Sequence, residues 1–136
     1  IELYDRPKTR FVAEFIGDSN ILDLSSVNQH EGWVEHQSIG RIKVQHFNPS
    51  PSTEPRYLLV RPEELVTLPD GVEPPDNSFT IEIGTIIHYG NESVMIGSIP
   101  GTDVSLRVRV SARAGRDLPD RGLIRVGWSA TNGYVV

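Results

Sequence analysis

Apolar and polar side chains alternate along several short segments, and this alternation limits the possible folds more than any other feature of the sequence. The clearest case is residues 104–111, where Val104, Leu106, Val108 and Val110 are separated by Ser and Arg residues. A period of two places successive side chains on opposite faces of a β-strand. The chain is therefore expected to consist mainly of strands with one buried face each.

Further strand-like segments occur between stretches rich in Pro, Gly, Asn and Asp, which favour turns. The expected strands are residues 21–24, 33–36, 41–45, 57–60, 79–88, 93–99, 104–111, 124–128 and 134–136. Gly84 interrupts the longest of them, which predicts a β-bulge or a sharp bend. About eight or nine short strands predict an all-β fold, a small OB-like barrel or sandwich.

The connections are expected to be polar loops at 48–55, 69–78 and 114–122, with one helical turn at 62–65. Asn132-Gly133 is a strong signal for a tight hairpin turn before the final strand.

Residues 7–16 predict one short amphipathic α-helix near the N-terminus. Pro7 suits a first helical turn, and Gly17 suits the position just after a helix. The apolar stripe of this helix is Phe11, Val12, Phe15 and Ile16. So short a helix is marginal alone, and its stripe needs a surface to pack on: the β part of this chain, another domain or a second copy of the chain.

The 136 residues carry a net charge of -5 and no cysteine. Residues 18–100 have four basic and twelve acidic side chains, net -8, whereas residues 101–136 have six arginines and three aspartates, net +3. The acidic balance disfavours unspecific nucleic-acid binding, and the lack of thiols excludes a disulfide framework and thiolate zinc sites. The two oppositely charged regions are either ordinary solvated surface or patches that favour self-association.

Motifs for common catalytic chemistry are absent from the sequence. It has no phosphate-binding Walker A loop and no Gly-x-Ser-x-Gly elbow. The four histidines, His30, His36, His46 and His88, lack short metal-ligand spacings, so no metal site is expected. Trp128 ends an alternating apolar face and is expected in the core, whereas the environment of Trp33 is left open by its sequence context.

Ten positions between Glu2 and Asn20 resemble a sequence motif found at the C-terminal end of the nucleotide-binding domain in ATP-binding subunits of bacterial ABC importers. The matching residues are Glu2, Tyr4, Pro7, Phe11, Val12, Ala13, Phe15, Ile16, Gly17 and Asn20. Arg61-Pro62-Glu63 resembles a motif of the accessory domain that follows in this family, the transport-associated OB (TOBE) domain. His88-Tyr89-Gly90 and Val126-Gly127-Trp128 agree more loosely with the same domain.

The resemblance implies that residues 1–17 are the helical tail of a nucleotide-binding domain and that residues 18–136 are a TOBE-type β domain. Because the chain begins at Ile1 without a methionine, we expect it to be a piece of a longer protein. Its implied function is that of a regulatory and dimerisation domain, without catalysis of its own. The implied partners are the ATPase domain of the same chain, a second copy of the chain, and transmembrane permease subunits, at the cytoplasmic face of the membrane.

Polyamine import is the substrate class that the resemblance favours, and ATP with magnesium would be cofactors of the whole protein only. Arg61, Arg107 and Arg109 are weak candidates for ligand binding. The motif residues Arg61, Pro62, Glu63, Tyr89 and Gly90, and the stripe on 7–16, are candidates for structural or domain contacts. Adjacent carboxylates at Glu63 and Glu64 are interpreted as solvated charge or a local cap rather than as an acid–base pair.

Three other functions remain open from the residues alone. An OB-type module could bind single-stranded nucleic acid, which the net +3 of the last third permits. Such a module could instead sense a transported anion through Arg107, Arg109 and backbone N–H groups. A small β-barrel hydrolase would need a nucleophile–base pair that is visible only in three dimensions.

We predict that this chain does not bind ATP, because a nucleoside triphosphate requires a glycine-rich cradle, a lysine and magnesium ligands. Titration calorimetry with Mg-ATP should show no saturable heat. Saturable binding in the micromolar range would contradict the prediction.

Overall fold

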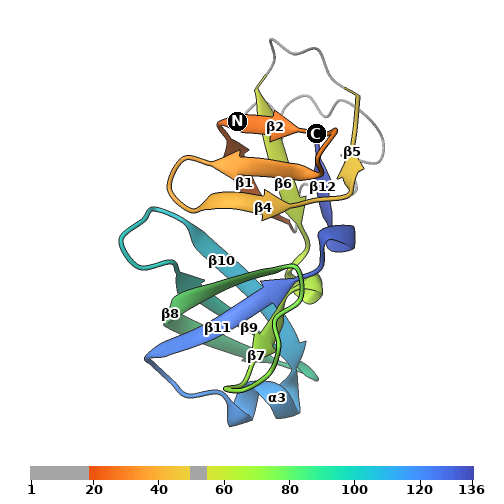
Figure 1. Ribbon diagram of the computed structural model, residues 1–136. Helices are drawn as coiled ribbons and strands as arrows, with labels where there is room; N and C mark the ends of the chain where they lie inside the picture. The colour runs from red at the N-terminus through yellow and green to blue at the C-terminus, as the bar shows by residue number, and fades with distance from the viewer. Residues whose placement is uncertain (1–18, 50–54) are drawn as a thin grey trace. The chain divides into compact units, whose positions relative to one another are not determined.

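The computed structural model describes residues 19–49 and 55–136, which contain twelve strands, one short α-helix and two 3₁₀ turns (Figure 1). These residues fall into two compact units. Unit 1 comprises the described residues up to Arg61 (19–49 and 55–61) together with residues 130–136, and unit 2 is Pro62–Ser129. The predicted helix at 7–16 lies outside the described residues, so the boundary between 17 and 18 stays a prediction.

Unit 1 contains a four-stranded sheet in the order β1-β6-β12-β5. Its strands are β1 (Asn20–Leu24), β6 (Arg56–Val60), β12 (Gly133–Val135) and β5 (His46–Phe47). Strand β6 runs antiparallel to both β1 and β12, whereas β5 is parallel to β12. Leu58 and Leu59, which point to opposite faces of this sheet, are both fully buried.

A three-stranded antiparallel sheet completes unit 1, formed by β2 (Ser26–Asn28), β3 (Trp33–His36) and β4 (Gly40–Lys43). Its buried face carries Val34 and Ile42, which are direct cross-strand partners. Arg56 ties segments distant in sequence together, because its Nη2 donates to the Asn48 carbonyl at 2.8 Å and its Nε to the Val136 carbonyl at 3.3 Å. Burial of the guanidinium lowers the pKa of Arg56.

Unit 2 is a five-stranded antiparallel sheet in the order β10-β9-β8-β11-β7 (Figure 1). Its strands are β7 (Val66–Leu68), β8 (Asn77–Tyr89), β9 (Glu92–Ser98), β10 (Ser105–Ser111) and β11 (Leu123–Trp128). The 3₁₀ turn η1 (Pro62–Glu64), which precedes β7 at one edge of the sheet, packs against β10 at the other edge. The sheet is therefore strongly curved, although no pairing closes it into a barrel within the described residues.

The bulge predicted at Gly84 is confirmed, and it divides the long strand β8 into two halves. The register with β9 shifts between Ile83 and Thr85. Before the bulge, Ile81 and Ile83 point into the core and are buried, whereas after it that side of the strand carries the half-buried Ile86 and the exposed His88. The extra residue thereby turns Ile87 and Tyr89 outward.

The prediction of a polar loop at 114–122 is wrong for its first residues, because Ala112–Asp117 forms the helix α3. Ser111 caps this helix by accepting a hydrogen bond from the Ala114 N–H at 3.1 Å. Six residues are too few for an amphipathic period to show in the sequence. The helix packs against β8, β9 and β10, with Gly115 directly over Ser93.

The hairpin turn expected at Asn132-Gly133 is also wrong. A 3₁₀ turn, η2 (Ala130–Asn132), ends there, and β12 pairs with β6 and β5 rather than with β11. A type I′ turn requires positive φ at both central residues, and neither Asn132 nor Gly133 has one. The strand count exceeds the eight or nine expected because β2, β5 and β7 are only two or three residues long.

Trp128 is a core residue as predicted, with 1% of its surface exposed and its ring stacked on Phe79 at 5.4 Å between centroids.

We predict that Gly97→Ala destabilises unit 2 by about 1–3 kcal/mol, because overpacking a filled core costs energy of this order. A Cβ at Gly97 would lie 2.7 Å from the Glu82 carbonyl oxygen and 2.9 Å from Cδ1 of Ile81. Urea denaturation should show the loss, while Ser98→Ala at the exposed neighbouring position should change the midpoint little. An unchanged midpoint for Gly97→Ala would contradict this packing.

Candidate functional site

Strands β8, β9 and β10 present an outer surface on which several predicted candidates meet. The registers place Ile87, Val94 and Arg109 in one row across the three strands, and Thr85, Ile96 and Arg107 in the next. Tyr89 and Glu92 continue the surface toward the β8–β9 turn. We call the set Ile87, Tyr89, Glu92, Val94, Ile96, Arg107 and Arg109 the hairpin face.

The hairpin face is partly apolar and open. Ile87 and Tyr89 are 48% and 47% exposed, respectively, while Val94 and Ile96 are half-buried between them and the arginines. Exposed apolar side chains that cluster in this way mark interaction surfaces more often than isolated ones do. The motif residue Gly90 has a structural part here, because its φ of 57° allows the tight turn that joins β8 to β9.

Arg109 links the Arg-Pro-Glu motif to the hairpin face. Its Nη1 lies 3.8 Å from Oε1 of Glu63 on η1, and its Nε lies 3.7 Å from Oε2 of Glu92 on β9. These distances are too long for hydrogen bonds, so the two contacts are loose ion pairs. They place a carboxylate on each side of one guanidinium and neutralise part of its charge.

The predicted site residues are thus only partly brought together. Arg107 and Arg109 share the hairpin face, and Glu63 contacts the second of them. Pro62 is buried and opens η1, as a proline suits the first position of a helical turn. Arg61 belongs to unit 1, and the stripe residues Phe11, Val12, Phe15 and Ile16 lie outside the described part of the chain.

Glu92 and Ile87 were not identified from the sequence. Their place depends on the β8–β9 register after the bulge, which local patterning does not specify. The Gly84 bulge was the available signal, since a one-residue shift exchanges the faces of every later position.

One serine–histidine pair lies within hydrogen-bond distance. Nδ1 of His88 is 2.8 Å from Oγ of Ser93. Ser93 is fully buried beneath Gly115 of α3, so its hydroxyl cannot reach a substrate. The pair therefore fixes the β8–β9 hairpin under α3 and does not support hydrolase chemistry.

Trp33, whose environment the sequence left open, is half-buried on the outer face of the three-stranded sheet. The guanidinium carbon of Arg41 lies 3.9 Å from the centroid of the Trp33 ring. The Nε1–H of Trp33 donates a hydrogen bond to Oε2 of Glu31 at 2.8 Å. A cation already stacks on the ring, which disfavours that ring face as a platform for nucleic-acid bases.

Neither a metal centre nor a membrane span is found in the described residues. Across 19–49 and 55–136, no three His, Asp or Glu side chains are grouped so that they could hold a metal ion. Over the same ranges, no helix combines the length and the apolar character needed to cross a bilayer.

We predict a small but specific coupling between Glu63 and Arg109. A double-mutant cycle with Glu63→Gln and Arg109→Gln should give about 0.2–1 kcal/mol, as for other exposed ion pairs. The coupling should shrink in about 1 M salt because of screening. The matched cycle with Glu64→Gln should give none, and equal couplings for Glu63 and Glu64 would contradict a specific contact.

No protein-family model matches the chain, but individual relatives do. It is 33% identical to the sn-glycerol-3-phosphate import ATP-binding protein UgpC 3 of Agrobacterium fabrum, over 93% of this chain and 32% of the relative. It is 27% identical to the putrescine transport ATP-binding protein PotG of Escherichia coli, over 99% and 37%. Identity to the spermidine/putrescine import ATP-binding protein PotA of Borreliella afzelii is 32%, over 65% and 24%. The chain thus spans between 24% and 37% of the length of these curated relatives.

Among solved structures, the fold is similar to that of the cytoplasmic molybdate-binding protein ModG with molybdate bound. The TM-score is 0.70 at 12% sequence identity, over 88% of this chain and 96% of that one. At this identity the likeness concerns the fold alone. Together with the relatives, it confirms the resemblance seen in the sequence: the chain is homologous to part of the ATP-binding subunits of ABC importers, and its β fold is of the TOBE type.

Proposed function

We propose that the chain is the accessory regulatory domain of an ABC importer ATP-binding subunit and that it contributes to dimerisation of that subunit. The observation that carries the proposal is the pattern of similarity. Nearly the whole chain matches two import ATP-binding proteins, but it matches only about a third of each. Since the sequence has no Walker A loop, the matching third is proposed to regulate rather than to hydrolyse ATP.

The hairpin face is the proposed contact with a second copy of the chain. A two-fold interface presents the same surface twice, so it must be complementary to itself. This face combines apolar side chains with both signs of charge, because it carries Arg107 and Arg109 and because Arg109 lies near Glu92 and Glu63. Arginines of one copy can therefore face carboxylates of the other, while Ile87 and Tyr89 supply apolar area.

Polyamine import is the proposed task of the whole protein. The putrescine and spermidine/putrescine proteins among the relatives support this substrate class. The sn-glycerol-3-phosphate import protein among them supports a different substrate. In this proposal the domain works at the cytoplasmic side of the membrane, next to an ATPase domain that binds ATP and magnesium and to permease subunits. The alternative of an anion or nucleic-acid binder is disfavoured, since Glu63 and Glu92 lower the positive potential around Arg109.

We predict a concentration-dependent monomer–dimer equilibrium that salt weakens. The double variant Ile87→Ser/Tyr89→Ser should raise the dimer dissociation constant about tenfold or more, because it removes apolar contact area. Sedimentation equilibrium at low and high salt measures both effects.

Val72→Ser is the matched control, because Val72 is similarly exposed at 45% but lies in the loop before β8. Strictly monomeric protein at high concentration and low salt would refute self-association. An equal effect of the control would refute the assignment of the hairpin face.

A further inference from the structure

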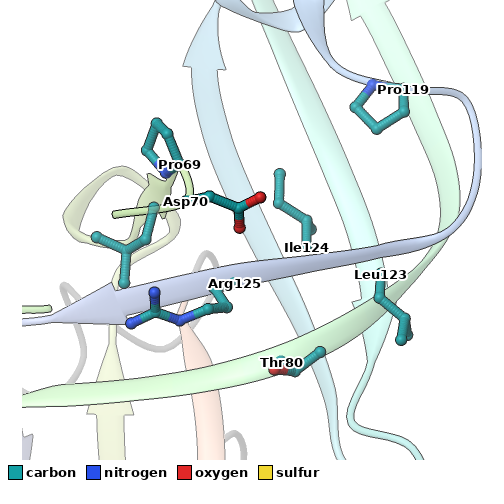
Figure 2. Close-up of a pocket in the computed structure, with 8 residues that line it drawn as sticks. Pro69, Asp70, Thr80, Pro119, Leu123, Ile124 and Arg125 are labelled. Atoms are coloured by element: carbon teal, nitrogen blue, oxygen red, sulfur yellow. The ribbon is translucent and has the colours of Figure 1, made fainter. Parts of the chain in front are cut away.

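A hollow of about 390 Å³ opens on unit 2 (Figure 2), and none of the hairpin-face residues lines it. Its floor is formed by Thr80 on β8 and Arg125 on β11, which are direct cross-strand partners. Its walls come from the end of β7 with the connection after it (Leu68, Pro69 and Asp70) and from Pro119 with the start of β11 (Leu123 and Ile124). Volumes of this order are typical of small-molecule sites.

Two opposite charges line the hollow. Asp70 stands on the wall after β7, and Arg125 stands on the floor (Figure 2). Within the residues that the structure describes, neither side chain forms a hydrogen bond or an ion pair. Both groups are therefore available to a ligand, and a ligand that satisfied both would need one cationic and one anionic group.

The rest of the lining is apolar. Leu123 is 63% exposed, the largest exposure among the big apolar side chains that the structure describes, and Pro119, Pro69 and Ile124 also face the hollow. Leaving Leu123 in water forgoes stabilisation that burial would supply. An aliphatic group placed against it would recover part of that stabilisation.

Prolines at both walls restrict the backbone on either side of the opening. Pro69 and Pro119 fix φ at their positions, which reduces the conformational freedom of the two connections. Less mobile backbone at the walls has less conformational entropy to lose when a ligand binds.

We propose that this hollow binds a small aliphatic zwitterion of the α-amino acid class. The ammonium group pairs with Asp70, the carboxylate pairs with Arg125, and the aliphatic side chain lies against Leu123 and Pro119. The site goes beyond the proposed role in dimerisation, and it does not depend on the hairpin face.

The test uses three probes that share one branched aliphatic body and differ in charge: L-leucine, 4-methylpentanoate and 3-methylbutylamine. NMR titration of the full ¹⁵N-labelled chain should show saturable amide shifts from L-leucine around Asp70, Thr80, Leu123 and Arg125. L-leucine should bind about fivefold or more tighter than either singly charged probe, since each exposed charge contact contributes modestly.

Two variants and two controls assign the roles of the charges. Asp70→Asn and Arg125→Gln should each weaken L-leucine binding about three- to tenfold. Asp103→Asn and Arg113→Gln, at exposed positions outside the hollow, should leave it unchanged. Absence of saturable shifts up to about 50 mM L-leucine overturns the proposal. Equal binding of the singly charged probes, or variants that match the controls, would also overturn it.

Discussion

The single extra residue at Gly84 determines what unit 2 shows to solvent. Strand β8 is the centre of the sheet, pairing with β11 along its first half and with β9 along its second. Without the shift, Ile87 and Tyr89 would continue the inward series of Ile81 and Ile83. With it, one side of β8 carries the half-buried Ile86 and His88, whose Nδ1 lies 2.8 Å from Oγ of Ser93, while Ile87 and Tyr89 join Arg109 on the hairpin face.

The sequence predicted those strands and buried residues that depend only on the alternation of neighbouring residues. The strands around Ile81, Val108 and Val126 follow from alternation, and the burial of Trp128 follows from its place on an apolar face. The Gly84 bulge was also readable, because glycine inside a strand weakens regular pairing. The shortest strands, such as β5 at His46–Phe47, were missed because they exist only through pairing with distant segments.

The candidate surfaces were less predictable, for a related reason. The two-residue period places Arg107 and Arg109 on one face, so their proximity could be anticipated. The contact of Arg109 with Glu63 joins residues from η1 and β10, and it depends on the curvature of the whole sheet. The hollow likewise combines Asp70 with Arg125, more than fifty positions apart, through the pairing of β7 with β11. No spacing in the sequence predicts that Arg109 lies near Glu63 or that Asp70 and Arg125 line the same hollow.

The route of the chain through unit 1 has a consequence for how the protein folds during synthesis. Strand β12 lies inside the sheet of unit 1, between β6 and β5, although 72 residues separate the end of β6 from its first residue. Unit 2 is one continuous segment, whereas unit 1 needs residues 130–136 to complete its sheet. During synthesis on the ribosome, unit 2 can therefore reach its final structure first. The edge of β6 that later pairs with β12 stays unpaired until residues 133–135 have emerged. A partner that covered this edge during translation would protect the chain at its most aggregation-prone stage.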